Sequence, residues 1–244
     1  MSTSGTLSTA LRVLSQLRRD HRTVALIVVV PSVLLTLLRF LFDGQQATFD
    51  RIAPPMLGLI PFFTMFIVTS VAMLRERTSG TLERLMSTPI AKIDLIVGYA
   101  MAFGVAALLQ VGVASTITFG FLGAPSNHLA VFLGLAGLSA LLGMALGLFA
   151  SAFANSEFQA VQFMPAFVLP QLLVCGLFVP RTLMVGWLET LSNVFPLTYT
   201  YDALELVSTR QTIPGQVGRD AIVLVGFLVA ALILGAATLR RRTD

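Results

Sequence analysis

Charged residues are scarce in this 244-residue chain: Asp, Glu, Lys and Arg make up 11% of it, against 56% hydrophobic residues. Soluble domains carry about a quarter charged residues, so the composition excludes a soluble fold. It predicts an all-α polytopic membrane protein. Cysteine occurs once, at Cys175, which excludes an intrachain disulfide and a cysteine metal cluster.

Lysine also occurs once, at Lys92, between Ala91 and Ile93. A phosphate-binding P-loop needs a lysine after glycine, so this chain forms no P-loop, and ATP-driven work would need another polypeptide. Motifs of the HExxH and GxSxG types, paired catalytic carboxylates and mid-span charges are missing too. The sequence therefore predicts no enzyme, no metal site and no proton-coupled carrier. Basic patches with interleaved aromatic residues are also missing, which argues against nucleic-acid binding.

The longest charged block runs from Arg75 to Gly98 and has a strongly hydrophobic run on each side. So many ionised groups cannot lie in hydrocarbon unless they are paired or wet. We therefore predict that residues 75–93 form a solvent-facing connection between two spans. An ordinary solvated loop is the alternative to a structured partner-binding segment.

Local chemistry in this block predicts a helix, a break and a second helix. Leu82, Leu85 and Met86 follow the i, i+3, i+4 spacing of one apolar helix face, which we expect to dock into a groove on a soluble partner. Thr88 and Pro89 are typical of an N-cap and a first helical residue.

The segment RERTSGTLERLMSTPI resembles the loop between the second and third spans of the ABC-2 type permeases, the membrane subunits of one class of ATP-driven exporters. In that family the segment forms the coupling helix against the ATPase subunit. The matching residues are Arg75, Glu76, Gly80, Thr81, Leu82, Glu83, Arg84, Leu85, Thr88 and Pro89.

Six apolar runs have about the 20 residues that a 30 Å hydrocarbon core requires. We predict spans at residues 24–42, 54–74, 94–121, 129–153, 158–179 and 221–239. Residues 1–23 precede them as an amphipathic helix, with an apolar stripe backed by arginines that is typical of a membrane-surface anchor; a direct partner contact is the alternative. In the fourth span, Gly143-x-x-x-Gly147 favours close helix contact inside one subunit.

Polar residues mark the second and fifth spans. Thr64 and Thr69 lie in the second, and Gln162 and Gln171 in the fifth. We treat these four as candidate pathway residues, with helix–helix hydrogen bonding as the alternative for the glutamines. Pro165 and Pro170 predict that the fifth span is bent.

The fifth span opens with a predicted capping box from Ser156 to Gln159. Glu157 would complement the helix dipole there. Its alternative roles are a cytoplasmic gate or a second contact with the ATPase.

Residues 180–219 contain two apolar stretches, 183–194 and 197–207, that are too short to cross a membrane. We predict two short re-entrant helices in the outer leaflet, with aromatic residues at the interface. The region resembles a family pattern that precedes the last span. Its matching residues are Gly176, Phe178, Pro180, Trp187, Leu188, Pro196, Leu197, Thr198 and Tyr199. Val185 and Glu205 depart from that pattern, which affects the subfamily and hence the substrate.

Basic residues are unevenly placed: eleven lie in the N-terminal segment, the coupling segment and the tail, and four lie on the other side of the predicted spans. The positive-inside rule then places both termini in the cytoplasm of a cell-membrane protein. The first apolar run is too long for the h-region of a cleavable signal peptide.

The resemblance implies a homodimer of six-span subunits with two separate ATPase subunits, which would bind ATP and Mg²⁺. It is nearest to the daunorubicin-resistance type of drug permease, an efflux protein of multidrug or antibiotic resistance. We expect a hydrophobic or amphiphilic cargo. The alternatives are a polysaccharide or lipid-linked glycan exporter and, from another class, a small intramembrane enzyme or membrane scaffold.

Overall fold

The computed structural model describes residues 3–87, 91–124 and 128–239, and within these ranges it contains helices and no strand. The helices are α1 (Thr3–Arg19), α2 (His21–Leu41), α3 (Gln46–Thr78), α4 (Thr81–Met86), α5 (Lys92–Ser115), α6 (Leu129–Ala150), α7 (Glu157–Val174), α8 (Gly186–Ser192), α9 (Pro196–Thr209) and α10 (Gly215–Ala237). A π-helical segment, Thr116–Phe121, continues α5. The predicted all-α class is confirmed.

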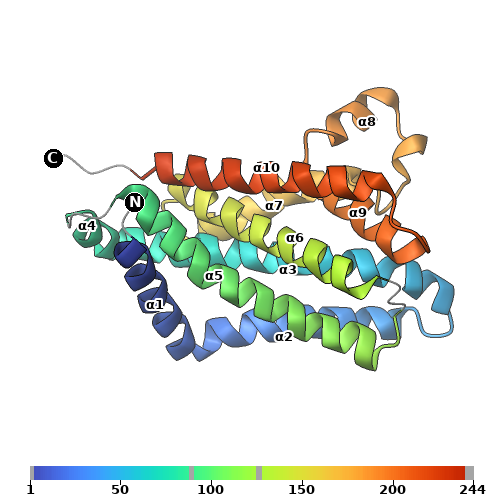
Figure 1. Ribbon diagram of the computed structural model, residues 1–244, viewed down its shortest axis with the longest axis horizontal. Helices are drawn as coiled ribbons and strands as arrows, with labels where there is room; N and C mark the ends of the chain where they lie inside the picture. Colours follow the sequence, from blue (N-terminus) through green and yellow to red (C-terminus); the bar gives the residue numbers. More distant parts are fainter. Residues whose placement is uncertain (1–2, 88–90, 125–127, 240–244) are drawn as a thin grey trace.

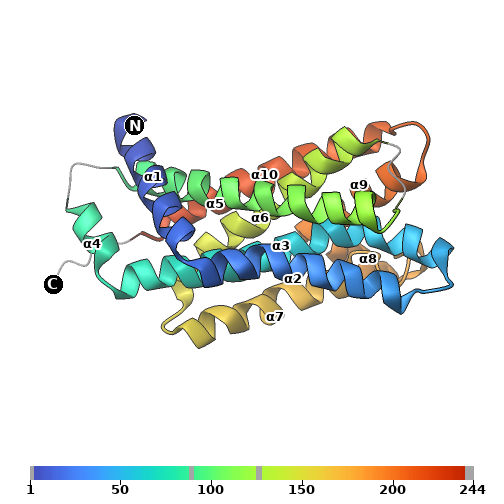
Figure 2. The ribbon, with the colours of Figure 1, turned by 90° about the horizontal axis from the view of Figure 1, so that it is seen from below.

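The long helices run beside one another along the long axis of the molecule (Figure 1). α4, the start of α1 and the end of α10 gather at one end of this bundle, which we call the α4 end. α8 projects from the other end, which we call the α8 end. α2 and α7 both pack against α3, and in the view from below α7 runs along one edge of the bundle (Figure 2).

α3 and α6 form the centre of the bundle because two glycines of α6 allow their backbones to approach closely. A Cβ atom on Gly143 would lie 2.9 Å from Cα of Phe62, and one on Gly147 would lie 3.1 Å from the carbonyl carbon of Phe66. Thr69 also donates its hydroxyl to the carbonyl of Met144 at 3.0 Å. The predicted close contact of the two glycines inside one subunit is confirmed.

Five helices within the described ranges are long and apolar enough to cross a membrane: α2, α3, α5 with its π-helical continuation, α6 and α10. The predicted count of six is not confirmed. The predicted span that is missing from this set is α7, a helix of 18 residues and about 27 Å that is less apolar than the other five. It contains a glutamate, three glutamines and two prolines, and it ends at Val174, before the predicted limit of residue 179.

The starts of two predicted spans also differ from expectation. α3 begins at Gln46, so the loop that the predicted spans leave between residues 42 and 54 is largely helical instead. Phe49 and Ala53 are fully buried against Ala124, and this packing holds the extra helical turns ahead of the prolines. α5 begins at Lys92, two residues before the predicted span start at residue 94; Thr88 and Pro89, the predicted N-cap and first helical residue, lie outside the described residues.

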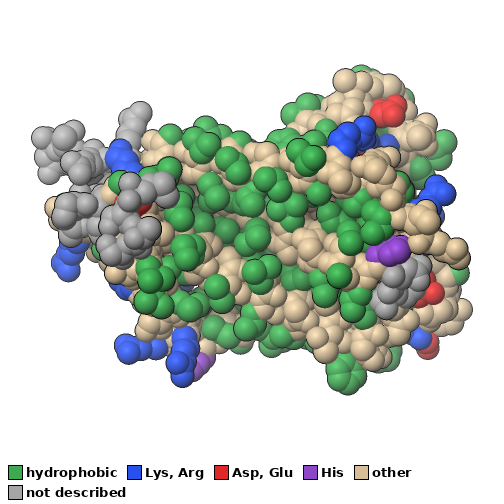
Figure 3. All heavy atoms as spheres, viewed as in Figure 1, with side chains coloured by type: hydrophobic (Ala, Val, Ile, Leu, Met, Phe, Trp, Pro, Cys, Tyr) green, Lys and Arg blue, Asp and Glu red, His purple; other side chains and the backbone are tan. Residues whose placement is uncertain are grey.

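Hydrophobic side chains cover the middle of the face drawn in Figure 3, and charged side chains gather at its two ends. α2 and α10 contribute strongly to the apolar surface, because only 17% and 22% of the residues in their most apolar 18-residue stretches are buried inside the chain. A water-exposed surface of this kind would be unstable, whereas a lipid environment accepts it. The structure is that of a multi-pass membrane protein.

Candidate functional site

The turn between α3 and α4 depends on Gly80. Its φ of 72° lies in the left-handed region that glycine adopts without strain, directly after the C-cap residue Ser79. The Ser79 and Thr81 hydroxyls lie 3.0 Å apart across this turn. The sequence motif therefore fixes the angle at which α4 leaves α3.

The apolar face of α4 packs onto its own bundle. Leu82 is only 3% exposed and joins the main core, and Leu85 is half-buried against the same cluster. The chain itself thus covers Leu82, against the expectation that this side chain docks into a partner's groove, whereas Leu85 keeps part of its surface exposed and its docking stays a prediction. Arg84 is exposed. The side chains of Glu83 and Met86 lie outside the described residues.

Arg75 joins α3 to the start of α7. Its Nε and Nη2 atoms donate to the two carboxylate oxygens of Glu157 at 2.7 and 2.9 Å. These hydrogen bonds hold the pKa of Glu157 below its usual value, so this carboxyl is ionised at neutral pH. Both side chains are more than half exposed, and such pairs contribute only about 0–1 kcal/mol to stability.

Glu76, the next residue, joins α3 to α1 and α5 through Arg12. Arg12 Nη1 donates to Glu76 Oε1 at 3.3 Å, and its Nη2 donates to the Tyr99 hydroxyl at 2.7 Å. α1 also fits closely onto α5, since a Cβ atom on Gly98 would lie 2.9 Å from the carbonyl oxygen of Thr6. The predicted surface helix is thus tied to the residues that lead into α4.

The predicted capping of α7 is present. The Ser156 hydroxyl accepts a hydrogen bond from the backbone N–H of Gln159 at 3.2 Å. The Gln159 side chain accepts from the backbone N–H of Asn155 at 2.8 Å, one residue before the usual capping-box partner. Glu157 follows the cap in the first turn, so it faces the helix dipole and Arg75 at once.

A groove of about 630 Å³ opens beside these ion pairs at the α4 end. We call it the α2–α7 groove, because it lies between the first turns of those two helices and is closed by parts of α1, α3 and α5. Its lining residues are Val13, Gln16, Leu17, Asp20, Thr23, Leu26, Ile67, Val68, Val71, Ala72, Arg75, Glu76, Ser79, Thr81, Tyr99, Phe103, Glu157, Phe158 and Val161.

The four candidate pathway residues do not share one surface. Thr64 and Thr69 are buried, and each hydroxyl bonds the carbonyl four residues earlier in α3. Gln171 is buried and donates to the Phe167 carbonyl at 2.8 Å. Gln162 is exposed, so it is the one member of the four that a cargo could reach in this conformation.

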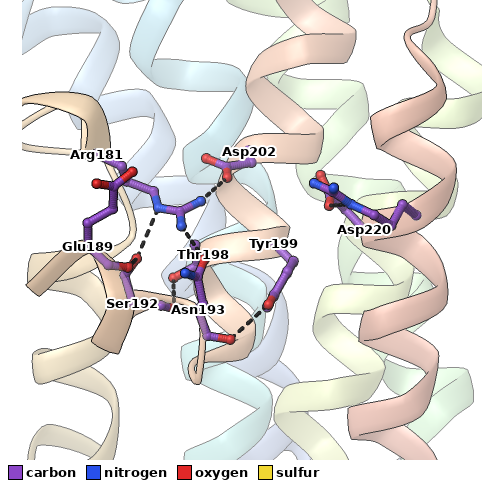
Figure 4. A network of polar contacts seen from close by, with 9 residues as sticks. Arg181, Glu189, Ser192, Asn193, Thr198, Tyr199, Asp202 and Asp220 are labelled. Atoms are coloured by element: carbon purple, nitrogen blue, oxygen red, sulfur yellow. Dashed lines mark hydrogen bonds and ion pairs between the residues drawn. The ribbon is translucent and has the colours of Figure 1, made fainter. Parts of the chain in front are cut away.

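At the α8 end, Arg181 holds the two short helices together (Figure 4). Its guanidinium donates to Asp202 Oδ2 at 2.6 Å, to the Ser192 hydroxyl at 3.0 Å and to the side-chain oxygen of Asn193. Tyr199 adds a hydrogen bond to the Asn193 carbonyl at 2.8 Å. We call these contacts the Arg181 clasp.

The sequence analysis missed the Arg181 clasp. The available signal was a pair of opposite charges in an apolar region, Arg181 before Pro196 and Asp202 after it. α8 and α9 fall in the two stretches predicted as short helices. Trp187 is 69% exposed on α8, and Pro180 precedes a short 3₁₀ turn.

Beside the clasp lies a polar cavity of about 340 Å³. Burial raises the pKa of Asp202 to about 6, which Arg181 offsets only in part.

The described residues contain no group of three His, Cys, Asp or Glu side chains that could hold a metal ion. One end of α3 is held by two ion-paired neighbours beside an apolar groove, and the far end of the bundle carries a clasped pair of short helices.

Comparison with known proteins gives a family match over most of the chain. The family described as ABC-2 type transporter matches residues 6–207, which takes in parts of every helix from α1 to α9. ABC transporter G family member 20 of Dictyostelium discoideum is 29% identical over 157 residues, covering 64% of this chain and 21% of that protein.

Two bacterial relatives are named as permeases. The probable multidrug ABC transporter permease YbhR of Escherichia coli (strain K12) is 26% identical over 152 residues, 62% of this chain and 41% of that protein. The linearmycin resistance permease protein LnrN of Bacillus subtilis (strain 168) is 23% identical over 217 residues, 87% of this chain and 55% of that protein. The chain thus spans less than two thirds of the length of each of these relatives.

Proposed function

Because this chain belongs to the ABC-2 type transporter family, we propose that it is the permease subunit of an ATP-driven exporter. A separate ATPase subunit binds ATP and Mg²⁺ and supplies the energy. The cargo is a hydrophobic or amphiphilic compound that leaves the cytoplasm. The names of relatives such as the multidrug permease YbhR and the linearmycin resistance permease LnrN support an efflux role.

The observation that carries this proposal is the direct connection of the long helix α3 to α4 through the tight turn at Gly80. α3 is a single helix of 33 residues, about 50 Å long, and it reaches from the turn at Gly80 to the α8 end. Arg75 and Glu76 tie its last turns to α7 and to α1. A displacement of α4 by the ATPase would therefore move the whole of α3 and, through these ion pairs, its neighbours.

The exposed side of α4 is the surface that we propose for the ATPase. Arg84 lies there, and charged groups at the edge of an interface steer association and fix the register of docking. Arg84→Glu should reduce the ATPase activity that copurifies with tagged permease from native membranes. Arg22→Glu, an equal charge change at an exposed site of the same end, is the matched control. Equal copurification with both variants would exclude α4 as the docking element.

We place the α4 end in the cytoplasm, following the excess of basic residues there. In a Cys175→Ser background, Gln45→Cys and Thr190→Cys should react with a membrane-impermeant maleimide on intact cells. Ser79→Cys should react only after permeabilisation. All three labelled positions lie outside the five helices that are apolar enough to cross a membrane. Labelling of Ser79→Cys in intact cells would show that the α4 end lies outside the cell and that the proposed orientation is wrong.

The exporter is proposed to be a homodimer with two ATPase subunits. The weakly buried faces of α2 and α10 are available for contact with lipid or with a second copy. A complex of two permease and two ATPase chains in native mass spectrometry is the expected result, and a stable complex with one permease chain would exclude it.

A further inference from the structure

The α2–α7 groove has the size of a small-molecule site. Its volume of about 630 Å³ falls within the range of roughly 300–1,000 Å³ that drug-sized ligands occupy. Its wall is apolar, with Leu26 on α2, Val71 on α3 and Val161 on α7 among the contributors. Its charged residues form one edge, at the N-cap of α2, the last turn of α3 and the first turn of α7. An occupant therefore needs an apolar body and a polar group at one end.

The charges at this edge decide the polar group. Asp20, Glu76 and Glu157 line the groove with one cation, Arg75. Arg75 forms an ion pair with Glu157, and Glu76 forms one with Arg12, which does not itself line the groove. Among the described residues Asp20 makes no ion pair; its carboxylate accepts hydrogen bonds from the backbone and hydroxyl of Thr23. Three carboxylates therefore face two guanidinium groups at the mouth of the groove, and Arg75 attracts Asp20 as well as Glu157.

We infer that the α2–α7 groove binds a cationic amphiphile, with its tail on the apolar wall and its cationic group beside Asp20. This inference rests on the proposed export function and deepens it by giving the charge of the cargo and the place where it enters the permease. An anionic amphiphile would meet the surplus carboxylate, and like charges repel. A neutral one gains the apolar contact alone.

Access to the groove is linked to α4 through Arg75. The Arg75–Glu157 pair bridges α3 and α7 at the mouth, five residues before the turn at Gly80. Because α3 is continuous up to Thr78, a tilt of α4 would change the separation of the two side chains. The pair is solvent-exposed and weak, so it can open without a large barrier. Cargo loading and ATPase movement then act on the same helix end.

Binding of three probes with the same dodecyl chain tests the inference. The full-length permease is placed in phosphatidylcholine nanodiscs, and binding to empty nanodiscs is subtracted. Dodecyltrimethylammonium should bind more tightly than dodecyl maltoside, and dodecyl sulfate most weakly. Asp20→Asn keeps a good helix cap and should weaken binding of the cation alone, by about three- to fivefold. Asp43→Asn, an equal charge change at an exposed residue of the α8 end, should leave all three unchanged.

Steric variants of α7 locate the site. Val161→Trp fills the groove and should weaken all three probes by at least about tenfold, because the apolar contact is lost. Leu173→Trp is the control, since Leu173 is 62% exposed on the same helix and does not line the groove. Two results would overturn the inference: dodecyl sulfate that binds as tightly as dodecyltrimethylammonium, or binding of dodecyltrimethylammonium that is unchanged by Val161→Trp.

A labelling measurement covers the case in which Val161→Trp fails to fold. In the Cys175→Ser background, dodecyltrimethylammonium should slow maleimide labelling of Leu26→Cys, which lines the groove, and not of Leu34→Cys, which is exposed elsewhere on α2. Labelling of Leu26→Cys that is blocked without any probe would indicate a second permease copy in the groove and refute the inference. Both measurements omit ATPase docking, so their failure is distinct from failure of the proposed function.

Discussion

Gly143→Ala is the substitution whose cost the structure defines most directly. The new methyl group would lie 2.9 Å from both Cα and the carbonyl carbon of Phe62, well inside van der Waals contact. These are main-chain atoms, so no side-chain rotation can relieve the overlap. α3 and α6 would have to separate along the centre of the bundle.

The expected loss has three parts. Overpacking of a tight interior costs about 1–3 kcal/mol. The hydrogen bonds from Thr69 to Met144 and from Ser139 to Gly58, both 3.0 Å, would lengthen, and interhelical hydrogen bonds in membranes are worth about 0.6 kcal/mol each. Alanine regains up to about 1 kcal/mol of helix propensity. The free energy of unfolding should therefore fall by about 1–3 kcal/mol in total.

Unfolding of purified permease in mixed micelles, with rising dodecyl sulfate fraction, measures this loss. Gly134→Ala in the same helix is the control, because no heavy atom lies within 4 Å of its added Cβ. That variant should be as stable as the parent or up to about 1 kcal/mol more stable. If Gly143→Ala and Gly134→Ala unfold at the same detergent fraction, the close approach of α3 and α6 does not hold in the membrane protein.

The remaining predictions concern polar side chains. Burial raises the pKa of Asp202 to about 6, above that of an unfolded aspartate, despite Arg181. The stability from this group is complete at low pH and is lost as pH rises through the folded-state pKa. The free energy of unfolding should thus fall by about 1 kcal/mol between about pH 5 and pH 7. Asp202→Asn should flatten that slope, and an unchanged slope would refute the assignment. Arg12→Ala should cost about 1–3 kcal/mol in the same unfolding assay, because two partner oxygens lose their donor; no loss would mean that α1 is held by apolar contacts alone. Gln162→Leu should alter which compounds cells export at matched membrane expression, since this side chain is exposed. Gln171→Leu should leave export unchanged, because Gln171 is buried, and a reversed pattern would contradict the exposure of Gln162 and the burial of Gln171.

Much of the fold followed from hydropathy. The apolar runs, the charged block after the second run and the two short stretches before the last one all appear as helices or breaks near their predicted places. Local chemistry also predicted the cap at Ser156. These features depend on neighbouring residues and on the exclusion of unpaired charge from hydrocarbon, so no knowledge of distant contacts was needed.

The burial of individual polar residues could not be predicted from hydropathy. Thr69 and Gln162 are similar in a sequence reading, because each is a polar residue in an apolar run. Thr69 bonds across to α6, whereas Gln162 is exposed. The difference depends on how each helix is rotated about its axis within the bundle. The sequence pattern leaves that rotation open where a helix is apolar on every side, because hydrophobic periodicity is then absent.

The class of protein, the approximate helices and the cap at Ser156 thus follow from the sequence. The tertiary structure alone decided which charges meet: Arg75 pairs with Glu157 across 82 positions of sequence, and Arg12 with Glu76 across 64. It also turned Leu82 of α4 inward, against an expectation drawn from spacing alone. Spacing tells which residues share a helix face, but the partner of that face is fixed by the packing of helices far apart in the chain, which local chemistry does not encode.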